Sequence, residues 1–106
     1  MFNLSMMRDK EKNAVQITVS GEIDLMAAPE FKKRLYEAVG DGNADVVLDC
    51  FDLSYIDSTG LGILLGALKR VRQNNHHVII RNLKDSIRKL FRITGLDKAF
   101  ILEEAQ

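Results

Sequence analysis

The strongest constraint on the fold is a leucine-rich segment that lies between two short apolar runs. The runs, at residues 46–48 and 78–80, consist only of Val, Leu and Ile, which is typical of strands buried on both faces in a parallel sheet. Between them, apolar side chains recur at intervals of three and four residues, which indicates a helix with one buried face. The residues of that face are Leu61, Leu64, Leu65, Leu68 and Val71. A strand, a helix and a second strand in this order predict two parallel strands joined by a crossover helix.

A hairpin is expected ahead of this unit. Residues 15–20 alternate between apolar and polar side chains, which is the period of a half-buried strand, and residues 2–6 alternate more weakly. The polar run at residues 9–13 supplies a turn between them. Pro29 suits the first turn of a following helix, and the sequence Gly-Asp-Gly-Asn at residues 40–43 would end that helix.

A third helix is expected after the second apolar run. Asp85 or Ser86 would cap its start, and Gly95 is well placed to end it. Residues 99–102 are expected to form a last short strand, which leaves residues 103–106 as a tail.

Together these elements predict one domain over residues 1–106, with an α/β fold. Its mixed β-sheet would have an N-terminal β-hairpin followed by alternating helices and strands. The chain has 15 basic and 15 acidic residues, so its formal net charge is zero and offers no broad field to attract nucleic acid or an anionic membrane. No apolar run approaches the ~20 residues that span a bilayer, and we expect no leader segment at the start of the chain. Because Cys50 is the only cysteine, no intrachain disulfide is possible, and we expect a cytoplasmic protein.

Ser58 is the candidate functional residue, because it lies between an acid and a glycine directly ahead of the leucine-rich helix. We expect it within one residue of the helix N-cap, where backbone N–H groups lack partners and the helix dipole adds about half a positive charge. A phosphate on the hydroxyl would be tolerated there and would add about −1.5 to −2 charges to the surface. The alternative is an ordinary capping hydroxyl, which would stabilise the helix by about 1 kcal/mol. A nucleophilic serine fits less well, since Ile56 stands where that motif needs glycine and no basic partner stands out.

The remaining acidic, histidine and cysteine side chains favour structural roles over metal binding. Asp49 and Asp52 are three residues apart after a buried strand, a poor spacing for a metal site, and are expected to bond to the turn backbone. His76 and His77 are neighbours on or before a strand, so their side chains point to opposite faces and cannot share one ion. Cys50 is most simply a small core residue. No metal or cofactor is expected.

Three segments carry a resemblance to a known family. They are residues 21–24 (Gly-Glu-Ile-Asp), residues 56–62 (Ile-Asp-Ser-Thr-Gly-Leu-Gly) and residues 94–97 (Thr-Gly-Leu-Asp). Through them the chain resembles the anti-sigma factor antagonists, single STAS domains of bacterial regulation, and the resemblance implies a STAS-like fold. In that family, a serine in an Asp-Ser-[Ser/Thr]-Gly motif is phosphorylated by an anti-sigma factor that is an ATP-dependent serine kinase. A metal-dependent serine phosphatase reverses the reaction. The unmodified antagonist binds the anti-sigma factor and frees the sigma factor, whereas the phosphorylated form lets go.

The resemblance implies that Ser58 is the phosphorylation site and that the protein is not itself an enzyme. The partner-binding residues that it implies are Asp24, Asp57, Ser58, Thr59, Gly60, Leu61 and Gly62. Asp24 could equally be a capping acid for the helix that contains Pro29, and Thr59 is a minor candidate for a second phosphorylation site. The alternative function is a STAS scaffold subunit of a stress-signalling or transport assembly, without a phosphoswitch.

Overall fold

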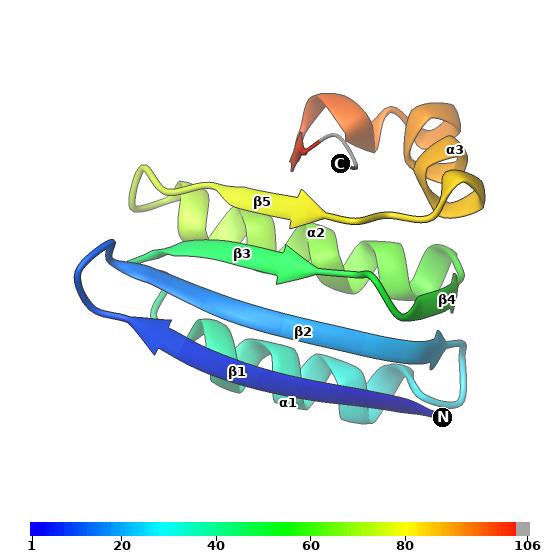
Figure 1. Ribbon diagram of the computed structural model, residues 1–106, viewed down its shortest axis with the longest axis horizontal. Coiled ribbons are helices and arrows are strands. Elements are labelled where there is room, and N and C mark those ends of the chain that lie inside the picture. The colour runs from blue at the N-terminus through cyan, green and yellow to red at the C-terminus, as the bar shows by residue number, and fades with distance from the viewer. Residues whose placement is uncertain (104–106) are drawn as a thin grey trace.

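The computed structural model describes residues 1–103 (Figure 1). Residues 104–106, which belong to the expected tail, lie outside the described residues. The elements in chain order are β1 (Phe2–Asp9), β2 (Ala14–Ile23), α1 (Ala28–Val39), β3 (Asp45–Asp49), β4 (Leu53–Ile56), α2 (Ser58–Arg72), β5 (Val78–Arg81), α3 (Asp85–Thr94), the 3-10 helix η1 (Leu96–Lys98) and β6 (Ile101–Leu102).

The sheet is mixed, as the sequence predicted. Its strand order is β1-β2-β3-β5-β6, and β4 pairs with β2 outside this path. β1 and β2 form the expected antiparallel hairpin, with Phe2 opposite Gly21 and Asp9 opposite Ala14. The other pairings are parallel, and α2 connects β4 to β5. The predicted α/β class and hairpin are therefore confirmed.

β4 is the element that the sequence did not predict. The long strand β2 pairs with β3 along its first half and with β4 along its second half, and the register shifts between Gly21 and Glu22. Gly21 has a φ of +88°, and a Cβ there would lie 2.4 Å from the carbonyl oxygen of Met1. A glycine is therefore required where the partner of β2 changes. The chain consequently returns to the sheet before α2 begins, so α2 starts at the end of a strand.

The core lies between the sheet and the helices. Figure 1 shows α1 and α2 on the same face of the sheet, and the two helices contact each other. Phe31 and Leu35 of α1 are fully buried there. Val46 and Leu48 of β3 belong to this core, whereas Val47 is buried but lies outside it. The expectation that residues 46–48 form a strand buried on both faces is confirmed, because all three side chains are buried, although α1 and α2 both lie on one face.

Most of the predicted helix ends are confirmed, and one is wrong. Pro29 lies in the first turn of α1, Gly40 ends that helix with a φ of +61°, and Gly95 ends α3 in the left-handed conformation. The N-cap of α3 is Lys84, so neither Asp85 nor Ser86 caps it. The backbone becomes helical one residue earlier than the capping preference of Asp and Ser suggests. None of the helices formed by residues 1–103 has the length and apolar character needed to span a bilayer.

Candidate functional site

Two loops that follow neighbouring parallel strands form the candidate site. β2 and β4 end side by side, with Ile23 opposite Ile56. The backbone N–H of Asp57 donates to the carbonyl oxygen of Ile23 at 3.3 Å, which joins the ends of the two strands. Asp24 follows one strand directly and Asp57 follows the other. The loop that contains Asp24 therefore lies beside the Ser58 turn, as expected.

Asp57, rather than Ser58, caps α2. Its backbone is extended, its carboxylate oxygen Oδ1 accepts from the N–H of Gly60 at 3.1 Å, and its carbonyl oxygen accepts from the N–H of Leu61 at 3.0 Å. Ser58 is the first residue of the helix, within one residue of the cap as expected. The alternative in which Ser58 supplies the capping hydroxyl is therefore wrong. An N-cap side chain typically stabilises a protein by about 1 kcal/mol, and here Asp57 makes that contribution.

The Ser58 hydroxyl is left free by this arrangement. Ser58 and Thr59 are both exposed, and within residues 1–103 neither hydroxyl makes a hydrogen bond. In the first helical turn the side chain is held by a rigid backbone while its oxygen stays open to solvent. The Ser58 hydroxyl is therefore accessible to another protein from the surface.

The next three residues of the motif divide between packing and surface. Gly60 is buried, and a Cβ there would lie 2.6 Å from Cγ1 of Ile56 and 3.0 Å from Cγ2 of Ile23. Leu61 is 4% exposed and belongs to the core. Gly62 is exposed, with open space where a side chain would be. Gly60 and Leu61 thus position the turn against the strand ends, and Gly62 contributes bare backbone to the surface.

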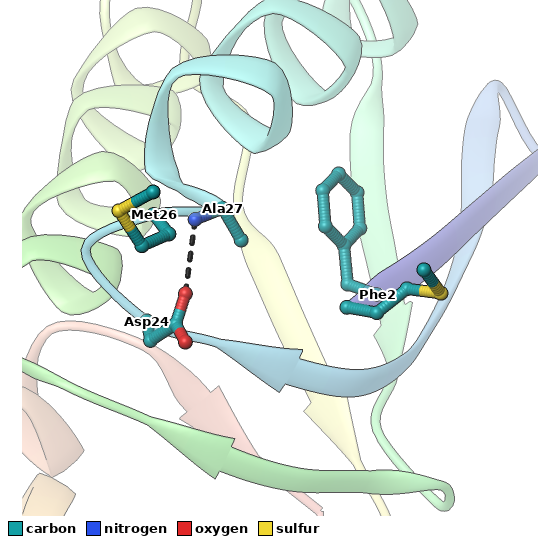
Figure 2. Close-up of a pocket in the computed structure, with 5 residues that line it drawn as sticks. Phe2, Asp24, Met26 and Ala27 are labelled. Carbon is teal, nitrogen blue, oxygen red and sulfur yellow. Dashed lines mark hydrogen bonds between the residues drawn. The ribbon is translucent and has the colours of Figure 1, made fainter.

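Asp24 closes the loop that precedes α1. Its oxygen Oδ1 accepts from the backbone N–H of Ala27 at 2.9 Å, as the dashed line in Figure 2 shows. Ala27 is itself the N-cap of α1 and makes no side-chain capping bond. The carboxylate therefore fixes the turn before the helix instead of capping the helix. The residues inside the turn, Leu25 and Met26, are exposed, and neither was among the predicted site residues.

The other candidate side chains have structural roles. Cys50 is 1% exposed, and burial, together with the charge of Asp49, raises the pKa of its thiol to about 12. The prediction that it is a small core residue is confirmed. The Asp49 carboxylate accepts from the backbone N–H of Phe51 at 3.0 Å, so its expected role in the turn is also confirmed.

The histidines do not form a shared site. Nδ1 of His76 lies 3.0 Å from Oδ1 of Asp45, and the same oxygen accepts from the backbone N–H of His77. Burial alone would raise the pKa of Asp45, but the two hydrogen bonds and the nearby histidine charges lower it. In the part of the chain that the structure describes, no group of three or more His, Cys, Asp or Glu side chains could hold a metal ion.

Comparisons with known proteins identify the class of this domain. The family model for the STAS domain matches residues 5–105. An anti-sigma-B factor antagonist of Staphylococcus aureus is 36% identical over 95 residues, which cover 90% of this chain and 88% of that protein. An anti-sigma-B factor antagonist of Bacillus subtilis is 35% identical over 95 residues, which cover 90% of this chain and 86% of that protein.

A solved structure agrees with this assignment. The Bacillus cell fate determinant SpoIIAA, in its phosphorylated form, is similar with a TM-score of 0.69 and 25% identity, over 98% of this chain and 92% of that chain. The chain belongs to the anti-sigma factor antagonists of the STAS domain family.

Proposed function

We propose that this protein is a phosphorylation-controlled anti-sigma factor antagonist that acts in the cytoplasm. The unphosphorylated form binds an anti-sigma factor serine kinase and thereby releases a sigma factor. Phosphorylation of Ser58 by that kinase ends the binding, and a serine phosphatase restores it. The kinase and the phosphatase supply the catalysis, so the antagonist needs no cofactor of its own. The names of the relatives and the phosphorylated form of SpoIIAA support this role.

One observation carries the proposal: the exposed Ser58 hydroxyl makes no hydrogen bond within residues 1–103, at a helix start that Asp57 already caps. A hydroxyl that stabilised the helix would lose this contact when modified. Here a phosphate replaces only the hydrogen of an exposed hydroxyl, so the cap and the fold survive. The N-terminal end of α2 also tolerates negative charge, because its dipole is positive there.

The added charge accounts for release of the partner. Transfer requires the γ-phosphate of ATP to approach the Ser58 oxygen, so the kinase holds nucleotide phosphates against this turn. After transfer, the phosphoserine faces the remaining nucleotide and lies next to the carboxylate of Asp57, both of them negative. Burying an unpaired charge at a contact typically costs about 2–5 kcal/mol, which is roughly thirty-fold to a few thousand-fold in affinity. The switch therefore needs no refolding.

The test is affinity capture from native lysate, with and without ATP, using the wild type, Ser58→Ala and Ser58→Asp. We expect a kinase-fold protein on the wild type and on Ser58→Ala, and its loss from the wild type alone when ATP is added and Ser58 gains phosphate. Ser86 offers a matched control, because it is exposed in the first turn of α3 and also follows an aspartate. Ser86→Ala should behave as the wild type does.

The contrary outcome is an identical set of partners on all baits, with Ser58 unmodified in mass spectrometry. Stable recovery of a large complex that Ser58→Asp does not disturb would instead support a scaffold subunit.

A further inference from the structure

Strand β1 forms a long free edge of the sheet. Within residues 1–103 it pairs with β2 alone, and Figure 1 shows it at the border of the sheet, next to α1. Proteins usually protect such an edge with a very short strand, a bulge, a proline or a charged side chain. β1 has eight residues in an unbroken register with β2, and residues 2–7 contain neither a charged residue nor a proline. This edge can therefore accept another strand.

The hydrogen bonds at the start of the hairpin show which backbone groups of β1 face outward. The N–H of Glu22 donates to the carbonyl oxygen of Met1 at 2.9 Å. Phe2 and Gly21 face each other between these two residues, so they form no bond to each other. Because bonded and non-bonded pairs alternate in an antiparallel hairpin, every second residue of β1 directs its N–H and C=O to the free side. These residues are Phe2, Leu4, Met6 and Arg8.

One of these outward groups has a partner within residues 1–103. The guanidinium of Arg34, on α1, donates to the carbonyl oxygen of Leu4. A carbonyl oxygen has two lone pairs, so this oxygen can accept a second hydrogen bond. The free edge is consequently able to form hydrogen bonds along its whole length.

The sequence of β1 is complementary to itself. In an antiparallel pair of β1 strands with its two-fold axis at Ser5, all the outward backbone groups lie in bonded pairs. Leu4 then lies opposite Met6 of the second copy, and Phe2 lies opposite Arg8 of the second copy. Apolar side chains thus face each other, the aliphatic stem of Arg8 can cover the ring of Phe2, and no like charges are opposed.

A pocket of about 360 Å³ lies at the same border, between β1 and α1. Its lining residues are Leu4, Ser5, Met6, Arg34, Glu37 and Ala38. Met6 of a second copy would lie opposite Leu4 and so would reach this pocket. Met6 is 46% exposed in the single chain, and an unbranched methionine adapts its shape to an irregular site.

We infer that β1 is a self-association edge, through which two copies of this chain pair their β1 strands and join their sheets. A single added strand covers much less than the about 800 Å² per partner of a standard interface, so the dimer is weak and forms at high protein concentration. Ser58 lies at the Phe2 end of the sheet, because Phe2 faces Gly21 and the ends of β2 and β4 pair. The antiparallel pairing therefore puts the two Ser58 turns at opposite ends of the joined sheet. The inference does not depend on the proposed function.

Sedimentation equilibrium of the purified protein, from about 10 μM to about 1 mM, tests the self-association. We expect the wild type to form dimers increasingly over this range. Met6→Lys places a charge in the contact and should raise the dissociation constant at least about tenfold. Met6→Pro should do the same, because it removes an outward N–H and leaves the bonds to β2 in place. Ile93→Lys is the control, because Ile93 is 72% exposed on α3, and its dissociation constant should stay within about twofold of the wild type.

Disulfide cross-linking tests the register. Two Ser5 residues on the axis would form a non-bonded pair with Cα atoms about 4.5 Å apart, which a disulfide can bridge. The two Asn3 residues would be about 13 Å apart, although Asn3 is exposed on the same strand and the same face. With oxidised glutathione, Ser5→Cys should therefore form a covalent dimer and Asn3→Cys should not. Cys50 is common to both variants and is 1% exposed.

Three outcomes would overturn the inference. The first is a wild type that is monomeric at every concentration. The second is a dimer that Met6→Lys and Met6→Pro weaken no more than Ile93→Lys does, with all variants folded by thermal unfolding, because the contact would then lie elsewhere. The third is equal cross-linking of Asn3→Cys and Ser5→Cys, which would indicate random collision. Phosphorylation of Ser58 can occur in a monomer, so none of these outcomes bears on the proposed function.

Discussion

The helices α2 and α3 both begin with the dipeptide Asp-Ser, yet the two starts differ in structure. In α2, Asp57 is the N-cap and Ser58 is the first helical residue. In α3, Asp85 is already the first helical residue, the cap is Lys84, and no side chain makes a capping bond. A shift of one residue therefore decides whether the aspartate fixes the turn. The same two residues make a rigid platform for a hydroxyl in one place and an ordinary helix start in the other.

The largest expected difference between the starts of α2 and α3 is the effect of an added charge on partner binding. Ser58→Asp should weaken affinity for the anti-sigma factor by about thirty-fold or more, since it places a fixed charge inside the proposed contact. Ser86→Asp adds the same charge to the start of α3 and should change affinity less than about twofold. Calorimetric titration of both variants measures the difference. Comparable losses would mean that the partner covers α3 as well, and the two starts would then not differ in function.

A smaller effect is expected on stability when the close packing of the α2 start is disturbed. Gly60→Ala places a Cβ 2.6 Å from Ile56 and 3.0 Å from Ile23, both buried. Forcing extra volume into such a site typically costs about 1–3 kcal/mol of unfolding free energy. Gly62→Ala is the control, because its side chain meets open space, and a helical Gly→Ala change should stabilise by up to about 1 kcal/mol. Urea unfolding reports both, and a neutral Gly60→Ala would contradict the tight contact.

The smallest effect tests the cap itself. Asp57→Ala removes the acceptor for the N–H of Gly60 and should lower the unfolding free energy by about 1 kcal/mol. Asp57→Asn should keep most of the wild-type unfolding free energy, since asparagine caps about as well as aspartate. Asp85→Ala should cost only a few tenths of a kcal/mol through the helix dipole. If thermal unfolding gave equal losses for Asp57→Ala and Asp85→Ala, the difference between the two starts would not be energetic.

Much of the fold follows from periodicity, because a short apolar run indicates a strand buried on both faces and an apolar stripe indicates an element with one buried face. The hairpin, the strands at residues 46–48 and 78–80, and the helix with Leu61 were all predictable in this way. β4 was not, because only its first and last residues, Leu53 and Ile56, are buried, which leaves no period to read.

The candidate site was predictable in position but not in detail. Asp and Ser have similar preferences for the N-cap, so local energetics could not decide which of Asp57 and Ser58 caps α2. The decision comes from β4, whose end fixes where the helix must begin. The exposed pair Leu25 and Met26 had a sequence signal, two large apolar residues between an aspartate and a proline, but burial had to be known before the pair could be distinguished from core.

The divided pairing of β2 also bears on how the protein forms its candidate site during folding. Among residues 1–103, β4 pairs with no strand except β2, which lies about thirty residues earlier in the chain. The turn that carries Ser58 consequently depends for its shape on the pairing of β4 with β2. A partly folded or freshly synthesised chain would expose the serine without the turn that the proposed kinase would recognise. Under the proposed function, only copies that had reached the native state could then be switched off by phosphorylation of Ser58.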